Sequence, residues 1–127
     1  MLCVYLPVFD YSSRMHSYFS AGVMVPPAGS KTAQGIEMQF GVNVLGSHAF
    51  AVALLPVLRE TARNTPKCTV RVVVTASSAA AYLAPKEGVQ LEKVEQQEYI
   101  NQAGLGLYTK YGVSKFVSLL FSFSSIC

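Results

Sequence analysis

The chain contains no tryptophan, only three cysteines and few charged side chains. Asp, Glu, Lys and Arg make up 13% of its 127 residues, whereas 51% are hydrophobic. This balance argues against intrinsic disorder, which requires low hydrophobicity and high charge. The ten Lys and Arg residues are scattered and the formal net charge is +3, so the basic stripe of a nucleic-acid-binding surface is absent and no nucleic-acid partner is expected. The length allows one domain of ordinary size.

The cysteines and histidines form no recognisable metal or disulfide motif. Cys3, Cys68 and Cys127 are far apart, odd in number and include no CxxC pair, which does not predict a disulfide framework. His16 and His48 have no cysteine or second histidine nearby, and we predict no metal site. Isolated thiols are typical of a reducing compartment. The short apolar start lacks a basic n-region and does not predict a cleaved signal peptide, so we expect a cytoplasmic protein.

One uncharged stretch is long enough to cross a membrane. Residues 39–58 contain no charged side chain, and Glu37 and Arg59 flank them. About 20 apolar residues span a bilayer. However, Gln39, Asn43 and other polar residues fall inside the stretch, and polar groups are costly in lipid. We therefore interpret it as a buried helix of a soluble protein, with a membrane span as the alternative.

The apolar patterns predict strands that alternate with helices. Residues 18–25 fit a short strand, and an apolar helix covered on most sides is expected over residues 32–64. The valine-rich run at residues 69–75 is the clearest strand, and its continuous apolar character predicts cover on both faces of a parallel sheet. A charged insertion over residues 85–103, with a short helical turn, precedes a second apolar helix over residues 108–121. This order favours an α/β fold.

The strongest candidate for a chemical centre is the segment Tyr111-Gly-Val-Ser-Lys115. On a helix, Tyr111 and Lys115 are four residues apart and share one face. A lysine ammonium beside a phenol favours the phenolate, which gives a group able to donate and accept a proton. Ser77 and Ser78 follow the valine-rich strand, at the strand end where α/β folds bind ligands. Such a serine could hold a carbonyl oxygen, although each pattern alone also occurs by chance.

Taken in order, these segments resemble the short-chain dehydrogenases/reductases, nearest to the branch of retinol dehydrogenases and WW-domain oxidoreductase-like enzymes. The resemblance covers about residues 20–121. The residues that carry it are Gly35-Ile-Glu-Met-Gln-Phe-Gly-Val-Asn43-Val-Leu-Gly46, Leu54-Leu-Pro56-Val-Leu58, Arg71-Val-Val-Val-Thr-Ala-Ser77-Ser78 and Tyr111-Gly-Val-Ser-Lys115. The resemblance implies a Rossmann-like, doubly wound parallel sheet and an enzyme that interconverts a carbonyl and an alcohol with NADP or NAD.

The resemblance also implies a catalytic tetrad of Asn43, Ser77, Tyr111 and Lys115. Tyr111 would be the general acid/base, and Ser77 would position the substrate oxygen. Lys115 would favour the phenolate of the tyrosine and bind the nicotinamide ribose. Asn43 would sit at an irregular point of its helix and hold a water of the proton relay. Ser78, next to Ser77, could exchange roles with it.

The departures from the family pattern concern the cofactor site. Cofactor contacts are expected from Ala21 and Gly22, which match the end of the family's Asn-Asn-Ala-Gly segment, and from Asn43, Tyr111 and Lys115. The glycine-rich turn TGxxxGxG, whose helix N-terminus would receive the cofactor pyrophosphate, does not occur in the chain. Binding of NADP or NAD is therefore expected to be very weak.

These departures predict a chain truncated at both ends relative to the family. The expected fold is α/β and partial Rossmann-like, without the first βαβ unit and the C-terminal strands. Residues 1–18 would be an atypical N-terminal segment and residues 19–127 the central part of the family's domain. The expected function is an NAD(P)-dependent oxidoreductase by descent, acting on a small or lipophilic carbonyl or alcohol through a Ser-Tyr-Lys system and impaired by truncation. The alternative is a non-catalytic remnant or interaction protein that pairs through its two apolar helices, as a homo-oligomer or with a full-length relative.

Overall fold

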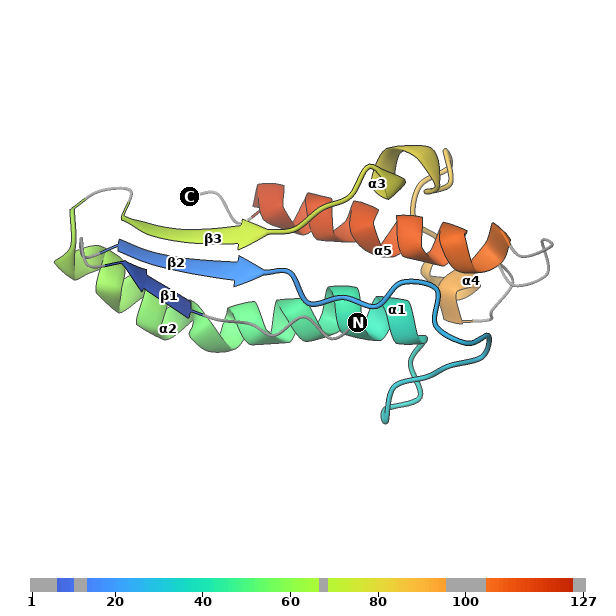
Figure 1. Ribbon diagram of the computed structural model, residues 1–127, viewed down its shortest axis with the longest axis horizontal. Helices are drawn as coiled ribbons and strands as arrows, with labels where there is room; N and C mark the ends of the chain where they lie inside the picture. The colour runs from blue at the N-terminus through green and yellow to red at the C-terminus, as the bar shows by residue number, and fades with distance from the viewer. Residues whose placement is uncertain (1–6, 11–13, 67–68, 96–104, 125–127) are drawn as a thin grey trace.

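The computed structural model describes residues 7–10, 14–66, 69–95 and 105–124 (Figure 1). All three cysteines lie outside the described residues, and so does the end of the predicted insertion after residue 95. The predictions made for the thiols therefore have no structural counterpart here. Among the described residues, no group of three or more His, Cys, Asp or Glu side chains is placed to hold a metal ion.

A three-stranded mixed sheet forms one layer of the fold. β1 (Pro7–Asp10) pairs antiparallel with β2 (Arg14–Phe19), and β2 pairs parallel with β3 (Val70–Val74). The parallel pair β2–β3 agrees with the predicted parallel arrangement, whereas the antiparallel β1 was not predicted. The strand expected over residues 18–25 is misplaced, because only its first two residues belong to β2. β2 also crosses the segment boundary predicted after residue 18.

A long helix joins β2 to β3 in three consecutive parts. They are α1 (Met38–Phe40), the π-helical turn η1 (Gly41–Gly46) and α2 (Ser47–Asn64), which continues through Pro56. The helix was predicted to begin at residue 32, which is wrong. It begins after Glu37, whose side chain accepts a hydrogen bond from the Phe40 N–H at 2.7 Å. A carboxylate at this position also suits the positive end of the helix dipole.

Among the described residues, three further helices follow β3. They are α3 (Ala79–Tyr82), α4 (Leu91–Glu95) and α5 (Leu105–Ser124). α5 confirms the second apolar helix and extends beyond both predicted ends, and α4 is the short helical turn expected in the insertion. α3 packs closely on α5, where a Cβ built at Gly112 would lie 2.6 Å from the carbonyl carbon of Leu83. Only a glycine permits this approach.

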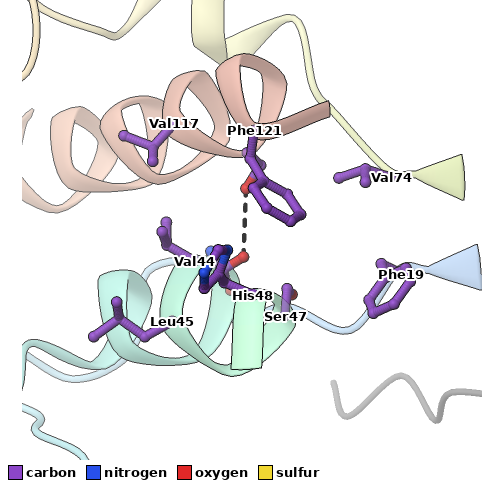
Figure 2. A pocket seen from close by; sticks show the side chains of 10 residues that line it. Phe19, Val44, Leu45, Ser47, His48, Val74, Val117 and Phe121 are labelled. Atoms are coloured by element: carbon purple, nitrogen blue, oxygen red, sulfur yellow. Dashed lines mark hydrogen bonds between the residues drawn. The ribbon is translucent and has the colours of Figure 1, made fainter. Parts of the chain in front are cut away.

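Helices cover one face of the sheet at the carboxyl ends of β2 and β3, whereas Val72, on the same face of β3 as Val74, is 41% exposed. Phe19 and Val74, paired neighbours at the ends of β2 and β3, point toward α2 and α5 (Figure 2). Successive side chains of a strand point to opposite faces, and Tyr18 and Val73, on the other face, are 44% and 39% exposed. The prediction that the valine-rich strand is covered on both faces is therefore wrong, because no described element covers the second face.

The long helix Met38–Asn64 is buried along one side only. Ala51 and Leu58 are buried against the rest of the fold. The large apolar residues exposed along the helix are Leu45, Phe50, Val52, Leu55 and Val57. The prediction of a buried helix, covered on most sides, is therefore wrong for the described chain, because its neighbours lie along one side. By length and composition this helix could cross a membrane, which is weak evidence, since core helices of soluble proteins meet the same criterion.

Candidate active site

Asn43 occupies the interior of the fold, in the π-helical turn η1. It is 3% exposed. Its Oδ1 accepts a hydrogen bond from the Val23 N–H at 2.8 Å, and its Nδ2 donates to the Val23 carbonyl at 3.0 Å and to Ser114 Oγ at 2.9 Å. A π turn inserts an extra residue into a helix and often marks a functional site. The turn lies where the irregular point of the helix was predicted, and the amide joins the segment after β2 to α5.

Lys115 and Tyr111 lie on the same side of α5, as their spacing predicts. Lys115 is buried, its Nζ lies 5.7 Å from the centroid of the Tyr111 ring, and it donates a hydrogen bond to the Thr75 carbonyl at 3.4 Å. Thr75 directly follows β3, so this bond ties α5 to the carboxyl end of that strand. Burial lowers the pKa of Lys115, because the charged ammonium loses solvation.

Gly22 lies against both Asn43 and Lys115. A Cβ at Gly22 would lie 3.1 Å from Asn43 Oδ1 and 3.5 Å from Lys115 Nζ. Because Gly22 has no side chain, Lys115 Nζ lies next to the backbone of Gly22. Ala21 precedes Gly22 in the same segment. The structure thus brings together four of the predicted residues, namely Gly22, Asn43, Tyr111 and Lys115.

Ser77 sits where the chain enters α3. Its Oγ accepts a hydrogen bond from the Ala79 N–H at 3.2 Å, so the hydroxyl helps to begin this short helix. Ser78 is exposed and its side chain makes no capping bond. No hydrogen bond joins Ser77 to Tyr111 or Lys115 within the described chain. What links the serine to the tyrosine is the packing of α3 on α5 at Gly112.

Sequence reasoning missed three polar groups that complete this region. Ser114 Oγ donates to the Tyr111 carbonyl at 2.8 Å, and the one hydroxyl hydrogen of Ser118 faces two acceptors, the Ser114 carbonyl at 2.8 Å and the Asn43 carbonyl at 3.3 Å. Gln39 is completely buried, and its amide bonds Val25 and Leu107. Buried polar side chains need partners. The signal for Gln39 was its occurrence four residues before Asn43 in an otherwise apolar stretch.

A cavity of about 110 Å³ lies beside Asn43, between the long helix, α5 and the ends of β2 and β3 (Figure 2). Its walls are mostly apolar, and Ser118 Oγ lies 3.3 Å from the Asn43 carbonyl oxygen in this region. His48 and Phe121 close one side, with ring centroids 4.7 Å apart in an edge-on arrangement. The cavity therefore adjoins the candidate site at Asn43.

A second buried lysine lies next to Tyr111 in the chain. Lys110 is 3% exposed and Glu37 is 8% exposed. Burial lowers the pKa of Lys110, and the negative charge of Glu37 opposes this by raising it.

The lowered pKa of Lys115 predicts how stability depends on pH. Between the lowered value and the ordinary value of 10.5, the unfolded chain holds more protons than the folded chain. The free energy of unfolding should therefore rise as the pH increases through this window. The stability gained in this way is lost when the pH falls below the window, where Lys115 is protonated in both states. Lys115→Met should flatten the rise, while the contribution of Lys110 should remain. Urea unfolding of both forms from neutral pH to 10.5 measures the difference, and equal slopes would contradict the prediction.

Curated proteins similar to the chain carry oxidoreductase names. The short-chain dehydrogenase/reductase pkfC of Emericella nidulans is 43% identical over 104 residues, which are 81% of this chain and 31% of that protein. A short-chain dehydrogenase/reductase of Phomopsis amygdali is 37% identical over 81% of the chain and 29% of its own length. An uncharacterized oxidoreductase of Schizosaccharomyces pombe is 36% identical over the same shares. The chain thus spans about three tenths of these relatives. No protein-family model and no solved structure matches it.

Proposed function

We propose that the chain carries the acid/base centre of an NAD(P)-dependent oxidoreductase. The premise is that the similarities above support the short-chain dehydrogenase/reductase family and a Rossmann-like fold. The reaction would interconvert a carbonyl and an alcohol on a small or lipophilic substrate, in a cytoplasmic setting. The names of the relatives support an oxidoreductase in general. The observation that carries the finer proposal is the convergence of Gly22, Asn43 and Tyr111 around the buried Lys115.

In this proposal Tyr111 gives the proton to, or takes it from, the substrate oxygen. Lys115 supports the phenolate through the charge of its ammonium, which lies 5.7 Å from the ring centroid. Ser77, at the start of α3, holds the same substrate oxygen through its hydroxyl. Asn43 holds the segment after β2 in place through its bonds to Val23. Both of its Nδ2 hydrogens are used in hydrogen bonds within the fold, so a relay water at this point would have to donate to an oxygen of Asn43.

The residues around Lys115 fit the ribose end of a nicotinamide cofactor. A lysine ammonium has three donors, and only the bond of 3.4 Å to Thr75 is made within the described chain. A Cβ at Gly22 would lie 3.5 Å from Nζ, so the glycine leaves this side of the lysine head without a side chain, and this is where the proposal places a ribose hydroxyl. When bound, the cofactor supplies or accepts the hydride.

The nicotinamide half of the cofactor provides a direct test. Reduced nicotinamide mononucleotide contains that half without the adenosine, so we expect it to shift the backbone NMR signals of Gly22 and Val23. Lys115→Met should weaken these shifts, because it removes the donors that face the ribose. Asn64→Ala is a matched surface control, because the Asn64 side chain bonds only within its own helix end. Equal shifts in wild type and Lys115→Met would contradict the proposal.

A second candidate is an interaction protein that pairs with a second copy through its apolar helices. The exposed apolar side of the long helix favours it, since Val52 is 49% and Val57 54% exposed. Apolar patches of this kind mark interfaces between proteins or with membranes. Light scattering on the eluting protein separates these cases. A dimer would support pairing, a monomer would contradict it, and recovery of the protein with membranes after carbonate extraction would indicate a membrane helix instead.

A further inference from the structure

Val25 has a backbone conformation that its side chain disfavours. Its φ is +49°, in the left-handed region, and it is the only non-glycine residue with a positive φ in the described chain. A β-branched residue in this region is an outlier, and the following Pro26 restricts Val25 further. Such a conformation persists only where the surroundings hold it. The question is which contact holds Val25.

Gln39 makes that contact. Its Oε1 accepts a hydrogen bond from the Val25 N–H at 3.0 Å, and its Nε2 donates to the Leu107 carbonyl at 2.8 Å. The side chain is completely buried, so neither bond can be replaced by water without opening the fold. One amide therefore joins the strained residue to the first turn of α5.

Asn43 makes the equivalent connection at the next turn of the helix. It bonds both backbone groups of Val23 and donates to Ser114 on α5. Two buried amides, four residues apart, thus attach the segment Val23–Val25 to α5 at two points. Gly22 immediately precedes this segment and lies against Lys115.

We propose that Gln39 is a positioning residue: it holds Val25 in the left-handed conformation and thereby sets how closely Gly22 approaches Lys115 on α5. Without the bond to Gln39, Val25 would relax to an ordinary negative φ, and the chain direction on both sides of it would change. Asn43 alone would then hold the segment through Val23, as a single attachment around which it can turn. That this approach matters for a nicotinamide cofactor rests on the proposed function, whereas the positioning itself does not.

The test compares three variants by NMR. Gln39→Met keeps the length of the side chain and removes both hydrogen bonds, Val25→Gly removes the strain, and Gln34→Met is the matched control on an exposed glutamine. A positive φ gives a strong contact between the amide and α protons of the same residue. We expect Gln39→Met to lose this signal at Val25 and to weaken the contact between Gly22 and the Lys115 side chain. Gln34→Met should change neither. An unchanged pair of signals in Gln39→Met would overturn the proposal.

A double-mutant cycle keeps the inference testable if Gln39→Met is unstable. If Gln39 holds the strained Val25, its removal lets Val25 relax, and the strain recovered offsets part of the lost hydrogen bonds. A glycine at this position has no strain to recover. We therefore expect the fall in the folding equilibrium constant caused by Gln39→Met to be roughly fivefold larger in the Val25→Gly background, a coupling typical of residues in direct contact. Equal falls in both backgrounds would mean that Gln39 only fills space. Both readouts are independent of cofactor binding, so failure of the proposed function would leave them unchanged.

Discussion

Tyr111→Phe is expected to reduce NAD(P)H-dependent carbonyl turnover by about a hundredfold or more, since general acid/base catalysis contributes about 10²–10⁴. The change removes one hydroxyl and keeps the ring that lies 5.7 Å from Lys115 Nζ. Proton transfer to the substrate oxygen would then lack its donor, while the packing of the ring is retained. The measurement is the rate of NADPH oxidation with a lipophilic aldehyde, at high protein concentration because cofactor binding is expected to be weak.

Tyr108→Phe provides the matched control for this prediction. Tyr108 lies on the same helix and is 42% exposed, so loss of its hydroxyl should leave turnover unchanged. Equal turnover in Tyr111→Phe and wild type would rule out Tyr111 as the acid/base. Loss of turnover in both variants would point to a general effect on α5 rather than to proton transfer.

Gly112→Ala is expected to lower the free energy of unfolding by about 1–3 kcal/mol, the usual cost of overpacking. A Cβ at this position would lie 2.6 Å from the carbonyl carbon of Leu83 and 2.8 Å from the Ala84 nitrogen. These are backbone atoms, so α3 must move away from α5. Alanine is the better helix former by about 1 kcal/mol, which offsets part of the loss, and Gly112→Val should therefore cost more.

Gly46→Ala is the control for this steric effect. Its Cβ would meet only the Gly41 carbonyl oxygen at 3.4 Å, an ordinary contact. Its stability should be unchanged or rise by up to about 1 kcal/mol. Thermal or urea unfolding of both variants gives the comparison. If Gly112→Ala were as stable as Gly46→Ala, the close packing of α3 on α5 would be incorrect. Because Ser77 lies two residues before α3 and its Oγ accepts a hydrogen bond from the first N–H of that helix, we also expect Gly112→Ala to shift the NMR signal of Ser77.

The second apolar helix and the valine-rich strand could be predicted from sequence because local patterns specify them. Tyr111 and Lys115 share one side of α5 as a consequence of helical periodicity, and a run of valines favours an extended chain whatever surrounds it. The start of the long helix was misjudged because residues 32–37 form a turn, in which Gly35 has a φ of +81°. The carboxylate of Glu37 then begins the helix at Met38.

The covering of the elements could not be predicted, because it depends on which neighbours are present. Apolar residues around the long helix and along the valine-rich strand predicted cover on most sides. The structure leaves Val52 and Val73 exposed. An apolar side chain gains free energy when it is buried. Its neighbours in the sequence do not show whether another element is present to bury it.

The sequence by itself determined the chemical types and their local spacing: a phenol and an ammonium four residues apart, a serine after a strand, and two amides in an apolar helix. The tertiary structure decided which of these meet. Gln39 reaches Leu107 across 68 residues of chain, and Asn43 reaches Ser114 across 71. Such contacts depend on the packing of α5 beside the π-helical turn, which no local periodicity encodes. For the same reason the sequence does not predict the positive φ of Val25, whose N–H bonds Gln39 from another part of the chain.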